Sequence, residues 1–152
     1  MLRNVWHTSW TVEDLDRSIA FYRDLLGFEL VQTRERRGVE IETVVGFRDV
    51  DLRIAFLKIP GALVGPSGHH LELIQYLSPK GVTLSVRTCD TGSAHLALQT
   101  DSIADDHARL TAAGVTVVSP PVTFTGGVAG AMHALYLRDP DGFTVELVQL
   151  GG

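Results

Sequence analysis

Two short stretches of the chain, TVELVQL from Thr144 to Leu150 and LELIQYL from Leu71 to Leu77, share one pattern. Each places a glutamate, Glu146 or Glu72, inside an apolar run and follows it with Leu, a β-branched residue and Gln. An unpaired ionised carboxylate in apolar surroundings is costly. Each glutamate must therefore point to water, pair with a cation or bind a metal ion. The repetition also indicates a chain built from two related halves.

Helical segments are expected near the start of each half. In the first half, Thr11 and Asp14 have the spacing of a capping pair, although Asp is a weaker partner than Glu at the second position. Apolar residues then recur at helical spacing, at Leu15, Ile19, Tyr22 and Leu26. Gly27 suits the left-handed position that follows a helix end, and Gly114 has the same place in the second half.

Strands are expected between each helix and the glutamate stretch that closes its half. Residues 39–47 and 52–59 in the first half, and 114–119 and 131–137 in the second, are rich in β-branched and aromatic residues. This order predicts an α+β fold of two tandem βαβββ modules. The modules would form a curved mixed β-sheet that encloses a cleft, with the helices on the outside.

The bulk properties fit this plan and narrow the function classes. The chain has 152 residues, enough for a single domain, with modules expected at 1–78 and 92–152 and a linker at about 79–91. Its net charge of −5 gives little support for a nucleic-acid partner. Cys89 is the only cysteine, so neither an intrachain disulfide nor a Cys-based metal site is expected.

The N-terminus lacks the apolar core of a signal peptide, and no apolar run is long enough to span a bilayer. We therefore expect a cytoplasmic protein without a membrane partner.

One histidine on the expected first strand and one glutamate on the expected last strand occur in both halves: His7 with Glu72, and His95 with Glu146. Alone, such a histidine is usually structural and such a glutamate usually solvated. If the halves pack about a pseudo-twofold axis, however, the four side chains converge. Two neutral imidazoles and two carboxylates suit one divalent ion, either Zn²⁺, Ni²⁺, Co²⁺, Mn²⁺ or Fe²⁺.

The chain resembles the vicinal oxygen chelate superfamily, which includes glyoxalase I, methylmalonyl-CoA epimerase, extradiol dioxygenases and bleomycin- or fosfomycin-resistance proteins. Four stretches carry the resemblance in the family's order, VEDLDRSIAFYRDLLGFEL, HLELIQY, AHLAL and DPDGFTVELVQ. The resemblance places the family's metal ligands on His7, Glu72, His95 and Glu146, the set found in bacterial-type glyoxalase I. It also implies a homodimer and a small-molecule substrate.

The resemblance implies a metal-dependent lyase or isomerase that transfers a proton through a metal-bound enolate or enediolate, with Glu146 and Glu72 as the catalytic pair. Two alternatives stay open, an Fe(II)-dependent extradiol-type dioxygenase and a non-catalytic antibiotic-binding resistance protein. The stretch HTSWTV, which begins at His7, lacks the arginine with which bacterial glyoxalase I holds a glutathione carboxylate. This departure counts against a glutathione substrate.

Four further residues are candidates for contact with the substrate. Trp10 could form a wall of the cavity or a subunit contact, whereas core packing is the more common use of Trp. His70 shares a strand face with Glu72. His133 lies on an expected strand that could line the cavity. Glu42, or its neighbour Glu40, falls on an expected strand where related epimerases keep a second acid or base. Solvated strand residues are the alternative for both glutamates.

Overall fold

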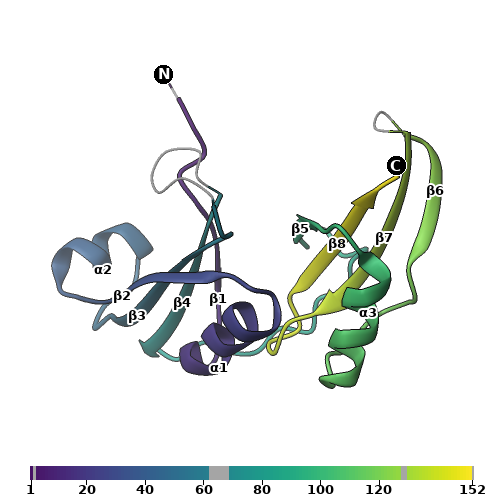
Figure 1. Ribbon diagram of the computed structural model, residues 1–152. Coiled ribbons are helices and arrows are strands. Elements are labelled where there is room, and N and C mark those ends of the chain that lie inside the picture. The colour runs from purple at the N-terminus through teal and green to yellow at the C-terminus, as the bar shows by residue number, and fades with distance from the viewer. Residues whose placement is uncertain (2, 62–68, 128–129, 152) are drawn as a thin grey trace. The chain divides into compact units, whose positions relative to one another are not determined.

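The computed structural model describes residues 1, 3–61, 69–127 and 130–151. The chain divides into two compact units, Met1–Thr83 and Leu84–Gly152, seen in Figure 1. Within the described residues, no helix is both long and apolar enough to cross a membrane.

The first unit contains one four-stranded mixed sheet in the order β1-β4-β3-β2. The strands are β1 (Thr8–Thr11), β2 (Glu29–Arg37), β3 (Asp51–Lys58) and β4 (His70–Ser78). Strand β1 runs parallel to β4, and the other neighbours are antiparallel.

The second unit repeats this topology in the order β5-β8-β7-β6. Its strands are β5 (His95–Gln99), β6 (Val122–Gly127), β7 (Gly130–Arg138) and β8 (Thr144–Leu150). Strand β5 is parallel to β8, and the other pairs are antiparallel. The expected α+β fold with a duplicated module is thus confirmed as two four-stranded mixed sheets, each with its own helices.

Helix α1 (Leu15–Ala20) continues into a π-helical turn, η1 (Phe21–Leu25), and α3 (Ile103–Ala112) has the matching place in the second unit. The helix ends follow the expected chemistry, because Gly27 has φ +76° and Gly114 has φ +80°. The cap of α1 differs from the expected Thr11: the carboxylate of Asp14 accepts hydrogen bonds from the backbone N–H groups of Asp16 and Arg17.

The strand expected at 39–47 is wrong, because these residues form helix α2 (Val39–Val45). Gly46 ends the helix in the left-handed region, at φ +76°. Ile41 and Val45, four residues apart, pack against a cluster of Val50, Leu52 and Ile54. This amphipathic packing outweighs the strand preference of a segment rich in β-branched residues.

The strand expected at 114–119 is also wrong. Only an isolated bridge between Val117 and Leu137 forms there, and the strand lies later, at β6. The strands expected at 52–59 and 131–137 correspond to β3 and β7.

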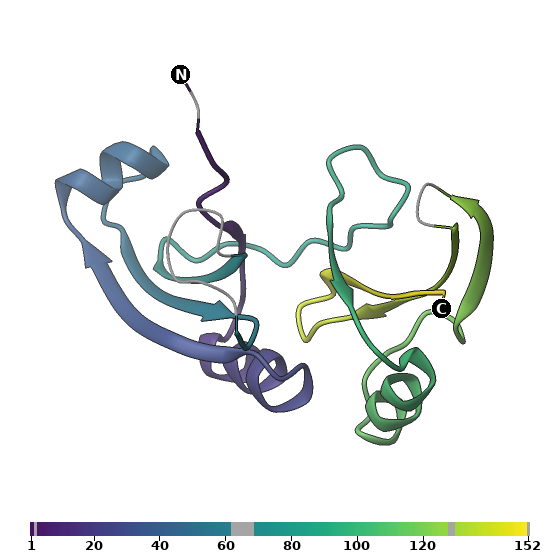
Figure 2. The same cartoon turned by 45° about the horizontal axis from the view of Figure 1, so that its top comes forward.

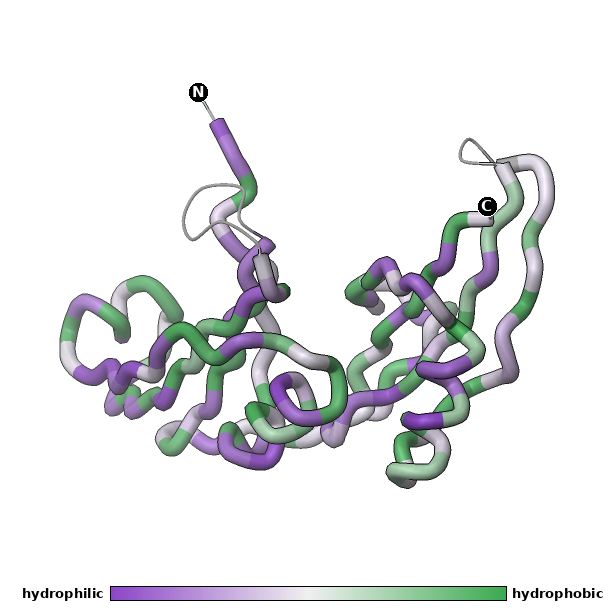
Figure 3. The backbone as a smooth tube through the Cα atoms, viewed as in Figure 1, coloured by the Kyte–Doolittle hydropathy of each residue, from purple (hydrophilic) through white to green (hydrophobic). Residues whose placement is uncertain are grey.

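Each sheet has two faces of different character. In the first unit α1 covers one face, where Leu71 and Leu73 of β4 are fully buried. Helix α2 packs on the other face, against the cluster that includes Leu52 and Ile54. Figure 2 shows the two helices on opposite sides of this sheet. Figure 3 shows hydrophobic and hydrophilic residues alternating along the helices and strands of each unit, as two-faced elements require.

Candidate metal-binding site

The first histidine and glutamate meet in the first unit. His7 precedes β1 directly, and Glu72 lies on β4, which pairs with β1 in parallel through Thr8 and Leu71. The His7 Nε2 and the Glu72 Oε2 are 3.3 Å apart. The Glu72 side chain is 11% exposed and that of His7 is 31% exposed. The glutamate is therefore nearly buried beside a partly accessible imidazole.

The second unit forms an equivalent pair. His95 opens β5 and is registered with Thr144, two residues before Glu146 on β8. The His95 Nε2 lies 3.2 Å from the Glu146 Oε2, and the Glu146 side chain is 15% exposed. The two units thus build equivalent pairs at equivalent places in their sheets, with separations that differ by only a tenth of an ångström.

An aromatic ring accompanies each pair. Phe56 of β3 is registered with Glu72, and its ring lies 6.0 Å from that of His7. Tyr136 of β7 is registered with Glu146, and its ring lies 5.5 Å from that of His95. Neither ring was expected from the sequence, because the proximity of each ring to a histidine–glutamate pair depends on cross-strand register. The sequence signal for both is their position, because Phe56 and Tyr136 each lie on the strand that precedes a glutamate stretch.

The donors present fit a divalent metal ion. Ligand atoms bound at about 2.0–2.1 Å in a tetrahedral arrangement lie about 3.3 Å from one another, close to both observed separations. The Nδ1 of His7 is buried and has no hydrogen-bond partner among the described residues. One nitrogen of this imidazole therefore has no hydrogen-bond partner in the part of the chain that the structure describes. Within the described residues, no group of three His, Cys, Asp or Glu side chains gathers at one place.

The repeated phrase also has a structural role on the other face of each sheet. Leu73 and Leu147 follow the glutamates and are buried. The Gln75 side chain donates a hydrogen bond to the Glu13 carbonyl oxygen at 2.7 Å. Gln149 accepts one from the backbone N–H of Ile103 at 2.9 Å. The glutamate therefore points to one face, while the leucine and glutamine fasten the strand to the start of the helix on the other.

The turn before β8 positions Glu146. Asp139 is buried, and its carboxylate accepts hydrogen bonds from the backbone N–H groups of Asp141 at 2.9 Å and Phe143 at 2.8 Å. Gly142 has φ +86°, a conformation that glycine adopts without strain. The DPDG sequence thus fixes the turn from β7 into β8.

His70 lies on the expected face. It is two residues before Glu72 on β4 and is registered with Lys58. Its Nε2 is buried and has no hydrogen-bond partner among the described residues. The Glu72 face therefore carries a second imidazole close to the His7–Glu72 pair.

Trp10 does not lie on that face, which contradicts its expected place in a cavity wall. It is registered with Leu73, on the face that α1 covers, and its ring is 5.7 Å from that of the fully buried Tyr22. Trp10 is thus part of the core under α1 and η1. The three-residue step from His7 to Trp10 reverses the strand face.

Glu42 and His133 also lie elsewhere than expected. Glu42 is on α2, not on a strand, and its carboxylate accepts a hydrogen bond from the backbone N–H of Asp49 at 3.0 Å. His133 is registered with Gln149, on the face of its sheet opposite to Glu146, and its Nδ1 is 2.9 Å from the Thr123 hydroxyl. The structure thus gives each residue a local structural contact away from the His–Glu pairs.

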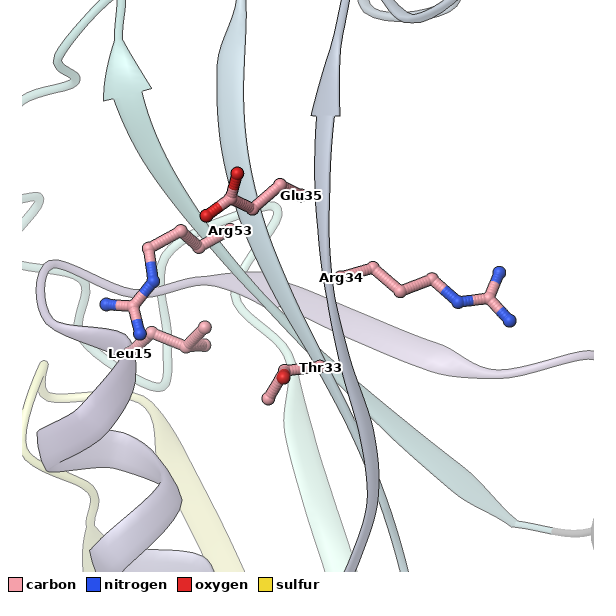
Figure 4. A pocket seen from close by; sticks show the side chains of 5 residues that line it. All are labelled: Leu15, Thr33, Arg34, Glu35 and Arg53. Carbon is pink, nitrogen blue, oxygen red and sulfur yellow. The ribbon is translucent and has the colours of Figure 1, made fainter.

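A shallow cavity in the first unit lies on the α1 face rather than at the His7–Glu72 pair. It has a volume of about 190 Å³ and is lined by Leu15, Thr33, Arg34, Glu35 and Arg53. Figure 4 shows the Arg53 head directed toward α1, where it forms a two-pronged ion pair with Asp16. The hydrogen bond from Arg53 lowers the pKa of Asp16 below its ordinary value. Because Arg53 is already paired with Asp16, the residues around this cavity give no indication of a chemical function.

Comparison with known proteins identifies the family. The model of the Glyoxalase/Bleomycin resistance protein/Dioxygenase superfamily matches residues 5–147. A 2-epi-5-epi-valiolone epimerase from Actinomyces sp. is 31% identical over 152 residues, covering 96% of this chain and 79% of the relative. A probable lactoylglutathione lyase from Vibrio parahaemolyticus is 29% identical, covering 95% of this chain and 89% of the relative.

The fold is shared with solved structures as well. A glyoxalase family protein from Bacillus cereus superposes with a TM-score of 0.81 at 22% identity, covering all of this chain and 97% of the other. Together with the family match over nearly the whole length, these findings show that the chain belongs to the Glyoxalase/Bleomycin resistance protein/Dioxygenase superfamily.

Proposed function

We propose that His7, Glu72, His95 and Glu146 together hold one divalent metal ion, and that the chain catalyses a proton-transfer reaction on a small substrate with two adjacent oxygens. The reaction belongs to the lyase or isomerase type. The observation that supports this most is the repeated pair, His7 with Glu72 at 3.3 Å and His95 with Glu146 at 3.2 Å. The relatives named as an epimerase and a lactoylglutathione lyase support the same reaction type.

The bound ion would supply Lewis acidity, drawing electrons from the two substrate oxygens and so acidifying the neighbouring C–H. The chain's own contribution is the pair of glutamates. Both side chains are largely buried, at 11% and 15% exposure, so little bulk water reaches them. A carboxylate held within hydrogen-bond reach of the carbon acid can then act as the base.

We assign removal of the proton to one of these glutamates and its return to the other. Return to the same carbon from the opposite side inverts that centre, which is an epimerase reaction. Return to the neighbouring carbon moves the carbonyl group, which is an isomerase reaction of the glyoxalase type. His70 lies on the same face as Glu72 and is a candidate contact for the substrate.

The test is hydrogen–deuterium exchange in D₂O, followed by NMR, on a panel of α-hydroxy ketones and on the hemithioacetal of methylglyoxal and glutathione. The chain is loaded in turn with Zn²⁺, Ni²⁺, Co²⁺, Mn²⁺ or Fe²⁺, and the metal content of each variant is measured. We expect metal-dependent exchange in at least one compound. Glu146→Gln and Glu72→Gln should lower it by about 100-fold or more.

The matched control is Glu13→Gln, which changes a glutamate whose side chain is 68% exposed and should keep the exchange rate. Oxygen consumption with Fe²⁺ and catechols, without exchange in any compound, would instead indicate a dioxygenase. Tight binding of a compound without exchange or oxygen uptake would indicate a binding protein.

A further inference from the structure

The Glu72 face of the first sheet continues onto the edge strand β2. Gln32 is registered with Phe56, and Arg34 with Ile54. Phe56 and Ile54 are in turn registered with Glu72 and Ile74 on β4. Arg34 therefore belongs to the same face as Glu72. Figure 4 agrees, because the Arg34 side chain extends from β2 to the side opposite to Thr33 and Glu35.

The guanidinium of Arg34 is held in place without being neutralised. Its Nε donates a hydrogen bond to the Gln32 side-chain oxygen at 3.0 Å. Its Cζ lies 6.0 Å from the centre of the Phe56 ring, within the range of a cation–π contact. Among the described residues, no carboxylate lies within ion-pair distance of Arg34.

Two arginines whose side chains lie on the other face of the sheet differ in this respect, whereas Arg36, two residues along β2, donates to the Glu35 carbonyl oxygen and, among the described residues, likewise has no carboxylate partner. Arg37, also on β2, pairs with Asp51 at 2.8 Å and with Glu35 at 3.7 Å. Arg53 on β3 pairs with Asp16 at 2.9 Å. In a chain of net charge −5, an arginine on this face without a carboxylate is a local site of attraction for anions.

Phe56 connects this cation to the His7–Glu72 pair. The Phe56 ring is 6.0 Å from the Arg34 Cζ and 6.0 Å from the His7 ring. The Arg34 Cζ and the centre of the His7 ring therefore lie no more than about 12 Å apart, a span that one small elongated molecule can bridge. The terminal nitrogens of Arg34 provide donors in the planar fork that matches carboxylate and phosphate oxygens.

We propose that Arg34 binds an anionic group, a carboxylate or a phosphate, on the substrate whose two adjacent oxygens are held at the His7–Glu72 pair. This inference rests on the proposed function, because it assumes that the substrate is anchored at that pair. It defines the substrate class as small anions that carry adjacent oxygens at the opposite end. Arg34 acts in binding and selection, and takes no part in the proton transfer.

The experiment uses the full chain loaded with Zn²⁺ and a series of hydroxamates as probes. Acetohydroxamate offers two adjacent oxygens and no charge at its far end. Monohydroxamates of succinic, glutaric and adipic acid add a carboxylate at increasing distance, and their methyl esters serve as neutral partners. A parallel series ends in a phosphonate. Binding is measured by calorimetry for the wild type, Arg34→Gln and the control Arg37→Gln, which alters an arginine whose partner is Asp51.

In the wild type, we expect the best carboxylate or phosphonate probe to bind about 10- to 100-fold more tightly than its neutral partner, as a charge-assisted hydrogen bond provides. Arg34→Gln should abolish this advantage and leave acetohydroxamate binding unchanged, whereas Arg37→Gln should preserve both. Comparison of the two anionic series identifies the preferred group.

If acetohydroxamate binds but the anionic probes gain nothing, or if their gain survives in Arg34→Gln, the role of Arg34 is refuted while the proposed function stands. If acetohydroxamate itself does not bind the Zn²⁺-loaded chain, the proposed function fails and this inference fails with it.

Discussion

At the scale of single residues, the phrase Glu-Leu-[Ile/Val]-Gln combines a glutamate of the candidate site with a glutamine that ties the strand to the start of the helix. Glu72 and Glu146 face their histidines, while Gln75 and Gln149 contact the segment at the start of the helix on the opposite face. Because side chains alternate along a strand, a three-residue step from Glu to Gln sends the two to opposite faces. The repetition thus preserves both roles in both units.

Removal of the Gln149 side chain, which holds the start of α3, should cause a measurable loss of stability. Gln149→Ala removes the acceptor of the Ile103 N–H at the start of α3, in a partly buried environment. An unsatisfied backbone donor of this kind costs about 1–3 kcal/mol. Urea denaturation should therefore show a free energy of unfolding lower by that amount. Gln99→Ala, at an exposed strand residue, is the control. An unchanged denaturation midpoint in Gln149→Ala would show that this hydrogen bond does not stabilise the fold.

The two His–Glu pairs were predictable from the sequence because residue type and position repeat in both halves. Phe56, Tyr136 and Arg34 were not, because their proximity to the pairs depends on cross-strand register that no local pattern encodes. Trp10 was misplaced for a related reason. Its place near His7 in the sequence made a cavity wall one candidate, but the strand alternation places it in the core.

At the scale of elements, α2 distinguishes the first unit from the second. Among the described residues of the second unit, no helix separates β6 from β7, whereas the first unit inserts Val39–Val45 between β2 and β3. The segment reads as a strand because Val, Ile and Thr dominate it, yet Ile41 and Val45 pack on the sheet at a spacing of four residues. Local composition is therefore a weaker guide here than tertiary packing.

The helix makes a sharp prediction for two adjacent valines. Val45 packs against the Val50–Leu52–Ile54 cluster, whereas Val44 is 80% exposed. Val45→Ala should lower the free energy of unfolding by about 1 kcal/mol through lost packing. Val44→Ala should leave it unchanged or raise it by a few tenths of a kcal/mol, because alanine has the higher helix propensity. Equal losses in both variants would contradict this packing of α2 on the cluster.

A second contact between elements fastens α1 to β3. The Arg53 guanidinium donates to both Asp16 carboxylate oxygens, at 3.0 Å and 2.9 Å. The hydrogen bond from Arg53 lowers the folded-state pKa of Asp16. A lowered carboxyl pKa means that the contribution to stability is present above the unfolded pKa, which is about 3.9. It is lost as the pH falls through the folded-state value.

The pair predicts a pH-dependent coupling between its partners. A double-mutant cycle of Asp16→Asn and Arg53→Gln at neutral pH should give a coupling below about 1 kcal/mol, because Asp16 is largely exposed to solvent. The coupling should vanish at a pH below the folded-state pKa of Asp16. Urea denaturation at several pH values measures it. A coupling that grew as the pH fell would contradict the ion pair.

At the scale of the whole molecule, the duplicated βαβββ topology was predictable because each module carries its own helix signals, glycine stops and closing glutamate phrase. The proposed convergence of the two histidine–glutamate pairs depends on packing between the modules, which residue patterns within one module do not encode. The proposed union of His7, Glu72, His95 and Glu146 around one ion is therefore the central claim. An expected homodimer remains a prediction for sedimentation analysis.

The most direct test counts metal ions per chain in the wild type, His7→Ala, His95→Ala and the control His133→Ala, by elemental analysis and calorimetric titration of the metal-free protein. The account predicts one ion per chain in the wild type and in the control. Either ligand variant should weaken that single site by at least about 100-fold, more than the loss of an outer hydrogen-bond partner of a ligand. Two ions per chain in the wild type, with each ligand variant losing just one, would show that the pairs act separately and would contradict the account.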